Sequence, residues 1–170
     1  MNKTFVIADT HFGHTNIIKY ENRPFINAVE MDKTLIANWN ETVGEGDTVY
    51  HLGDFAMCSG ERMREIVGRL RGRKVLIKGN HDEKSCKWYM DAGFDEVSTH
   101  PIIFREWIVM SHEPPAYISE HIPYFYLYGH VHGTQMYPAI CKQSACVCVE
   151  RWDYRPVDMD AIAQMVAKMG

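Results

Sequence analysis

Short apolar runs alternate with amphipathic stretches through the first half of the chain. Each apolar run is nearly continuous and ends in a polar residue or a glycine, which is typical of a buried strand. Between the runs, hydrophobic residues recur at helical spacing, as Met31, Leu35 and Trp39 do before Gly44. We predict strands over residues 3–8, 47–52 and 74–78, and helices over residues 28–43, 61–70 and 85–92.

The second half of the chain is richer in strands. Its apolar runs lie closer together, and the dipeptide Arg105-Glu106 suits a tight connection between two of them. Near the end of the chain, Met159, Ile162 and Met165 share one face of an amphipathic helix. We predict strands over residues 96–100, 102–104, 107–111, 125–128 and 145–150, and a helix over residues 158–169.

The order of these elements indicates the fold class. Alternation of strands and helices, followed by a strand-rich half, is typical of an α/β architecture. The number of predicted strands is best accommodated by two packed sheets, a β-sandwich flanked by helices. The 170 residues contain no internal repeat, low-complexity tract or linker, so we expect one domain over residues 1–170.

Composition and charge narrow the class of protein. The formal net charge is −4, which favours neither a nucleic-acid binder nor a membrane-surface protein. The apolar stretch at residues 5–8 is too short for a signal peptide, and no run approaches the roughly 18 apolar residues of a membrane span. We therefore expect a cytoplasmic protein without a membrane partner. The sequence does not indicate an oligomeric state.

The cysteines do not form a recognisable framework. There are five, an odd count, and their irregular spacing does not indicate disulfide pairing. Cys146 and Cys148 lie two positions apart, so a strand would point both thiols to the same face. A cysteine-held zinc site would need a second closely spaced pair, which the chain lacks. We interpret the cysteines as free thiols.

Polar clusters follow five of the predicted strands. In open α/β sheets, ligands bind at the carboxyl ends of strands, so one crevice could collect all five clusters. Glycine stands directly before Asp54, Asn80 and His130, where it permits close backbone approach to a crowded centre. The clusters are Asp9-Thr10-His11, Gly53-Asp54, Gly79-Asn80-His81-Asp82, Ser111-His112 and Gly129-His130-Val131-His132.

The side chains in these clusters are suited to metal binding. Asp9 and His11 are two positions apart, so on extended backbone they would project to the same side, as would His130 and His132. Carboxylates, an amide oxygen and imidazoles together favour Mn, Fe, Zn or Co over Ca or Mg. The set is too large for one tetrahedral zinc, whereas two ions bridged by a carboxylate would use it fully. We expect two divalent ions, with Mn favoured and Fe, Zn, Co or Ni as alternatives.

The five clusters together resemble the motifs of the calcineurin-like metallophosphoesterases. That family shows DxH, GD, GNH(D/E), a lone His and GHxH in this order, and the same order spans most of this chain. The segment from His11 to Phe25 further resembles a subgroup of small, single-domain bacterial and phage members. The resemblance implies a two-sheet β-sandwich flanked by helices, in agreement with the strand pattern.

The resemblance also implies which side chains bind the two ions. Three would hold the first ion and three the second, while Asp54 would bridge both together with a hydroxide that acts as the nucleophile. The family usually has glycine before the lone metal-binding histidine, where this chain has Ser111. The first set is Asp9, His11 and His132, and the second is Asn80, His112 and His130.

Further residues would act on the substrate. By the same resemblance, His81 would protonate the leaving oxygen as general acid, and Asp82 would orient His81. His14 and Arg23 follow the first cluster closely, and we include both as candidate substrate-binding residues because Arg suits bidentate phosphate contact. The alternative is that both lie in a solvated surface loop.

These roles imply a metal-dependent phosphoesterase that hydrolyses phosphodiesters or phosphomonoesters, with nucleotides within that class. The protein-phosphatase branch of the family carries an Arg soon after GD, whereas Gly53-Asp54 is followed here by Phe55-Ala56-Met57-Cys58. The lack of this Arg and of a cap domain disfavours a Ser/Thr protein phosphatase. The HxHxDH signature of the metallo-β-lactamase group, another class of dinuclear hydrolase, is absent as well.

Two alternatives stay open. A catalytically idle scaffold of the same fold would have lost ligands, whereas every expected ligand and His81 are present here. A basic stretch over residues 62–78 could contact a nucleic acid, but without interleaved aromatic residues a solvated helix face is the more usual interpretation. A small phosphate ester is therefore the expected partner.

Overall fold

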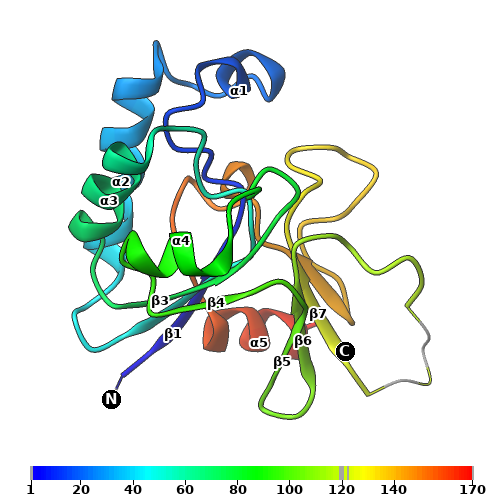
Figure 1. Cartoon of the computed structure of the whole chain (residues 1–170). Coiled ribbons are helices and arrows are strands. Elements are labelled where there is room, and N and C mark those ends of the chain that lie inside the picture. Colours follow the sequence, from blue (N-terminus) through cyan, green and yellow to red (C-terminus); the bar gives the residue numbers. More distant parts are fainter. Residues whose placement is uncertain (1, 119–120, 122, 170) are drawn as a thin grey trace.

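One layer of the molecule is a five-stranded sheet with the strand order β4-β3-β2-β1-β9. In this computed structural model, which describes residues 2–118, 121 and 123–169, strands β1 to β4 run parallel and β9 is antiparallel to β1 (Figure 1). The strands span Thr4–Ile7 (β1), Thr48–His51 (β2), Arg73–Ile77 (β3), Glu96–Ser98 (β4) and Val157–Asp158 (β9).

A four-stranded sheet with the order β5-β6-β7-β8 forms the second layer. Strands β6, β7 and β8 run parallel, and β5 pairs antiparallel with β6 through the tight connection at Arg105 and Glu106, both of which have positive φ. The strands span Ile102–Phe104 (β5), Ile108–Ser111 (β6), Phe125–Tyr128 (β7) and Ser144–Cys146 (β8).

The helices between residues 15 and 91 cover the outer face of the first sheet, whereas the helix near the end of the chain adds Met159 and Ile162 to the core between the sheets (Figure 1). Three of them begin at a side chain that accepts a hydrogen bond from the backbone N–H three residues later, namely Asn27, Ser59 and Ser85. No helix in the described part of the chain has the length and hydropathy that a membrane crossing requires. The helices span Thr15–Tyr20 (α1), Ala28–Thr42 (α2), Gly60–Arg69 (α3), Cys86–Asp91 (α4) and Met159–Ala167 (α5), with a 3-10 turn over Val149–Arg151 (η1).

Strand β1 is buried on both faces, which explains its continuous apolar run. Phe5 and Ile7 pack into the core beneath α2 and α3, whereas Val6 and Ala8 face the second sheet. The two sheets also meet through backbone hydrogen bonds, since Ala8 N donates to Val147 O at 2.9 Å. The loops that follow β1 and β8 therefore lie against each other.

The predicted architecture of two sheets flanked by helices is confirmed, with three differences in its elements. The strand expected over residues 145–150 ends at Cys146, and its last residues form the turn η1 instead. The short elements α1 and β9 were not predicted, because neither is long enough to show a hydrophobic period. Cys146 and Cys148 point to the same side as expected, with their Sγ atoms 3.3 Å apart, and both are free thiols.

Candidate metal centre

Seven polar side chains from five loops meet where the two sheets join. Each loop directly follows a strand, and neighbouring parallel strands deliver their loops to the same edge of a sheet. All seven residues expected to bind metal are therefore brought together by the fold. The loops after β1, β2 and β3 carry Asp9 and His11, Asp54, and Asn80, while those after β6 and β7 carry His112, His130 and His132.

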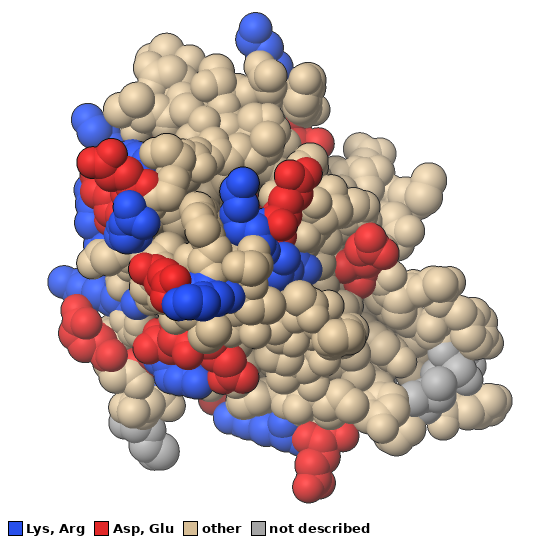
Figure 2. Space-filling view, viewed as in Figure 1, with Lys and Arg blue, Asp and Glu red and all other residues tan. Residues whose placement is uncertain are grey.

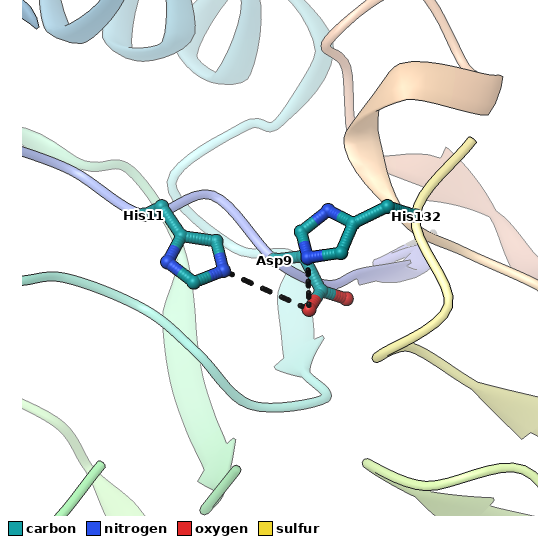
Figure 3. A group of neighbouring side chains, drawn as sticks. All are labelled: Asp9, His11 and His132. Atoms are coloured by element: carbon teal, nitrogen blue, oxygen red, sulfur yellow. Dashed lines mark ion pairs between the residues drawn. The ribbon is translucent and has the colours of Figure 1, made fainter. Parts of the chain in front are cut away.

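Asp9, His11 and His132 form the first group (Figure 3). The Nε2 atoms of His11 and His132 lie 4.0 and 3.7 Å from the same oxygen of Asp9, Oδ1, and the two rings flank the carboxylate. Asp9 Oδ1 and His11 Nε2 are buried and have no hydrogen-bond partner among the described residues. Buried polar atoms nearly always have a partner, and a cation between these atoms would serve as one.

Asn80, His112 and His130 form the second group. His112 Nδ1 lies 2.8 Å from the carbonyl oxygen of Leu52, which can only accept, so this nitrogen carries the proton. Burial lowers the pKa of His112, which keeps the ring neutral and leaves a lone pair on Nε2. His112 Nε2 lies 2.9 Å from Asn80 Oδ1, an oxygen that can only accept a hydrogen bond. Two acceptors at this separation are arranged as ligands of a shared cation would be.

Asp54 lies between the two groups. Its Oδ2 is 3.6 Å from His11 Nε2 and 3.5 Å from His112 Nε2, so one oxygen reaches both groups. Its Oδ1 accepts a hydrogen bond of 2.9 Å from the backbone N–H of His81. The side chain is 2% exposed, which leaves it little freedom to turn toward solvent. Asp54 is thus placed where a bridging carboxylate would have to be.

Five of the seven residues have a left-handed backbone. We expected the pairs Asp9/His11 and His130/His132 on extended backbone, and this expectation was wrong. A non-glycine residue in this region costs about 1–2 kcal/mol, so it persists only where the surrounding structure holds it. Such strain is concentrated at functional sites. The φ values are 59° for Asp9, 50° for His11, 57° for Asp54, 70° for His130 and 46° for His132.

Two glycines permit the close packing of these loops. A Cβ atom at Gly129 would lie 2.5 Å from Asp9 Oδ2, and one at Gly79 would overlap the carboxylate of Asp54. Any larger residue would therefore displace one of the two carboxylates. This agrees with the interpretation that glycine stands in the motifs because backbone must approach a crowded centre.

The electrostatics of the cluster favour bound cations. Burial, reinforced by the charge of Asp54, raises the pKa of Asp9 to about 8. Burial, reinforced by the positive charges of His132 and Arg23, lowers the pKa of His11. Without a metal ion both side chains thus favour their neutral forms. A divalent ion stabilises the carboxylate charge and accepts the imidazole lone pair, so the residues fit such ions.

His81 and His14 lie on the accessible side of the cluster. The His81 side chain is 46% exposed, and its Nε2 is 4.0 Å from Asp54 Oδ2. His14 Nδ1 is 3.3 Å from His11 Nδ1, and its ring is partly exposed. A substrate that approaches the carboxylate of Asp54 from solvent would meet these imidazoles first.

Asp82 makes different contacts from those expected. Its Oδ2 accepts hydrogen bonds from the backbone N–H groups of Asp54 and Gly79, at 2.7 and 2.9 Å, and its Oδ1 accepts from Phe55 N at 3.2 Å. We expected this carboxylate to orient the imidazole of His81. The structure instead uses it to tie together the two loops that carry Asp54 and Asn80.

Arg23 lies behind the cluster, which corrects its expected place in a phosphate pocket. Its side chain is 0% exposed and pairs with Glu150, an interaction that no sequence motif indicated. Glu150 Oε1 lies 3.0 Å from His132 Nδ1. The sequence offered only one signal for Glu150, a charged residue at the end of the apolar run over residues 145–149.

Comparison with known proteins gives one relative matched over nearly its full length and others matched in part. No protein-family model matches it. It is 37% identical to the uncharacterized protein MJ1445 of Methanocaldococcus jannaschii over 99% of this chain and 93% of that protein. It is 32% identical to the Gene 66 protein of Mycobacterium phage L5, over 66% of this chain and 51% of the phage protein. It is 32% identical to the glycerophosphodiester phosphodiesterase GpdQ of Enterobacter lignolyticus, over 47% of this chain and 29% of that enzyme.

Two solved structures share the fold. The protein of unknown function AQ665 from Aquifex aeolicus has a TM-score of 0.75 and 27% identity, covering 97% of this chain and 100% of that one. The nuclease MPE of Pseudomonas putida has a TM-score of 0.51 and 21% identity, covering 76% of this chain and 60% of the nuclease. At this level of identity the second likeness shows a common fold alone.

Proposed function

Because the chain belongs to the same family as the uncharacterized protein MJ1445, and its distant relatives point to a metallophosphoesterase-like superfamily, we propose that it is a metal-dependent phosphoesterase. The observation that carries this proposal is the pair of ligand groups that meet at Asp54. Such paired sites suit in-line displacement at phosphorus, in which both the attacking and the leaving oxygen need stabilisation.

The proposal assigns the two groups of the candidate metal centre to two divalent ions. The first group holds one ion and the second group, Asn80, His112 and His130, holds the other. Asp54 reaches both ions. When bound, such ions polarise the phosphoryl group and lower the pKa of water, which makes a nucleophile available near neutral pH. The mixture of oxygen and nitrogen ligands favours Mn, with Fe, Zn, Co or Ni as alternatives.

His81 is the proposed general acid. Its imidazole lies beside Asp54 yet is open to solvent, so it can meet the leaving oxygen of a bound ester. It donates its proton to that oxygen as the ester bond breaks. His14, at the other side of His11, is placed to contact the phosphoryl oxygens.

A groove leads away from His81. It has a volume of about 400 Å³, and its walls include Met57, Met63 and Trp88. Because His81 itself lines the groove, the group attached to the protonated oxygen can extend into it. The sulfur-containing and indole side chains favour a flat, mainly apolar leaving group, such as an aryl group or a nucleobase. We therefore place the leaving group of the substrate in this groove.

Trp88→Ala is expected to raise KM for an ester with an aryl leaving group roughly three- to tenfold, the range for loss of one aromatic contact. KM for an ester with a small alkyl leaving group should stay unchanged, because that group does not reach the indole. The matched control is Trp107→Ala, which removes an exposed tryptophan near β6 of the other sheet. Equal effects of Trp88→Ala on both esters would count against the groove.

The basic stretch over residues 62–78 gives little support for binding a long nucleic acid. Arg62 pairs with Asp32 and Glu65, and Arg73 pairs with Glu96. Figure 2 shows acidic side chains interspersed with the basic ones on the face in view. A positive field that follows a nucleic-acid backbone needs unpaired cations over a continuous surface. A small phosphate ester is the better substrate.

The proposed function is tested by hydrolysis of matched p-nitrophenyl esters, one phosphate monoester and one phosphodiester. Metal-stripped protein should be inactive, and added Mn should raise turnover of at least one ester more than about 100-fold. The diester is expected to be preferred, because the distant relative GpdQ is named a phosphodiesterase and a protein that shares the fold is named a nuclease. If the protein binds metal but hydrolyses neither ester, the catalytically idle scaffold is favoured. If metal-stripped protein hydrolyses an ester as fast as metal-loaded protein, the proposed site is excluded.

A further inference from the structure

A cluster of charged residues, two of them with buried side chains, lies directly behind the first group of candidate ligands. It consists of Arg23, from the loop after α1, and Glu150 and Arg151, from the turn η1. We call these three residues the brace. The side chains of Arg23 and Glu150 are 0% and 8% exposed, in contrast to exposed ion pairs such as Arg73 with Glu96. Burying such a pair is costly unless every polar atom is used, which calls for a reason beyond stability.

The guanidinium of Arg23 uses all five of its N–H groups. Nε and Nη2 donate to Glu150 Oε1 at 2.9 and 2.6 Å. Nη2 also donates to the carbonyl oxygen of Asp9 at 2.7 Å, and Nη1 donates to that of Thr10 at 2.9 Å and to Met31 Sδ at 3.4 Å. Arg23 therefore binds the backbone of the left-handed segment that aims Asp9 and His11 at one point.

Arg151 does the same for the loop that carries His132. Its Nε donates to the carbonyl oxygen of His132 at 2.6 Å, and its Nη2 donates to that of Thr134 at 2.6 Å. His132 also has a positive φ, so this segment too is held in a conformation that it would not adopt alone. Both strained ligand loops of the first group are thus fastened by an arginine.

Glu150 links Arg23 to the ligand His132 itself. A carboxylate paired with Arg23 can only accept, so His132 Nδ1 donates to Glu150 Oε1 across 3.0 Å. In the neutral ring, a proton on Nδ1 leaves a lone pair on Nε2, the atom that faces Asp9 Oδ1 at 3.7 Å. Carboxylates that fix a ligating imidazole in this way strengthen metal binding. Glu150 Oε1 is occupied by these hydrogen bonds, whereas Glu150 Oε2 is buried and has no hydrogen-bond partner among the described residues.

The second group has no equivalent support from the brace. His112 is fixed by the backbone carbonyl of Leu52, and the loop that carries Asn80 is tied by Asp82. None of these contacts involves Arg23, Glu150 or Arg151. The two groups are therefore held mainly by different contacts, with one link between them, the hydrogen bond of 2.8 Å from His130 N to Asp9 Oδ2.

We infer that the brace of Arg23, Glu150 and Arg151 sets the affinity for the ion held by Asp9, His11 and His132, and leaves the affinity of the other position largely unchanged. The inference rests on the proposed function only in requiring that the protein bind two ions. The three residues act through the ligands and touch neither ion nor substrate, so they are positioning residues. They make the two metal positions independently adjustable.

Calorimetric titration of metal-stripped protein with Mn tests the inference. Wild-type protein should bind two ions, and Glu150→Gln should weaken one of them about 10–100-fold while the other changes little, as expected for loss of a carboxylate behind a ligating imidazole. The control Glu96→Gln breaks an exposed ion pair with Arg73 and should leave both ions unchanged. Electron paramagnetic resonance of the Mn-loaded protein should change from the signal of a coupled pair to that of an isolated ion.

Arg23→Lys provides a second variant that retains the charge and removes the planar fork. It should reproduce the selective loss of one ion, and it keeps the inference testable if Glu150→Gln does not fold. Equal weakening of both ions, together with a lower Tm of the metal-free protein, would show that the brace is merely structural. Unchanged binding of both ions would also overturn the inference. Wild-type protein that bound no ion would instead contradict the proposed function.

Discussion

Asp54→Ala is expected to remove both ions and to lower kcat/KM by roughly a thousandfold or more, since metal ions supply several kcal/mol of charge stabilisation at phosphorus. The size of the effect follows from the position of Asp54, whose Oδ2 is within 3.6 Å of a histidine from each group. Loss of this one carboxylate takes a ligand from both positions. Metal content by elemental analysis and turnover of a p-nitrophenyl diester measure the two consequences.

Asp47→Ala is the control for this substitution. Asp47 precedes β2, at the end of the strand opposite to Asp54, and its carboxylate accepts hydrogen bonds from the backbone N–H groups of Lys3 and Gly44. It should leave the metal content near two ions, even if the variant is less stable. An Asp54→Ala protein that kept both ions, or one that lost its ions but stayed active, would contradict the bridging position of Asp54.

His81→Ala is expected to slow hydrolysis of an ester with a poor leaving group about 100- to 10,000-fold, the usual contribution of a general acid. The physical reason is that an alkoxide is expelled slowly unless it is protonated as the bond breaks. The p-nitrophenolate ion leaves readily without a proton, so the same variant should lose much less activity on a p-nitrophenyl ester. A steeper dependence of kcat on leaving-group pKa than in the wild type is the measurement.

The metal content of His81→Ala provides the internal control. The imidazole lies 4.0 Å from Asp54 Oδ2 but belongs to neither ligand group, so both ions should stay bound. Full activity on the poor leaving group would exclude His81 as the acid. Loss of an ion would show instead that His81 is a ligand.

The elements that place the site were largely predictable from the sequence. Apolar runs such as that at β1 identify buried strands, because a parallel strand covered on both faces is built mainly from apolar residues. The polar residue that ends each run then marks the carboxyl end, where parallel strands share one edge. The convergence of the seven candidate ligands follows from these two local facts, and the structure brings all seven together.

The conformations within the loops were not predictable in the same way. Because Asp9 and His11 are two positions apart, we predicted that both lie on extended backbone, yet both have a positive φ. The preference of a single residue for the extended region amounts to about 1–2 kcal/mol, which a few buried hydrogen bonds can exceed. Asp82 likewise has the sequence position of a partner for His81, but three backbone N–H groups compete for it in the folded chain.

The sequence by itself determined which residues can serve as ligands and which strands they follow, since both depend on side-chain chemistry and on neighbours a few positions apart. Only the tertiary structure decided what lies behind the ligands. Arg23 and Glu150 are 127 positions apart, and either alone reads as a surface charge. A buried charge is tolerated only when the fold supplies its counter-charge and satisfies its hydrogen bonds, and that condition is met through space rather than along the chain.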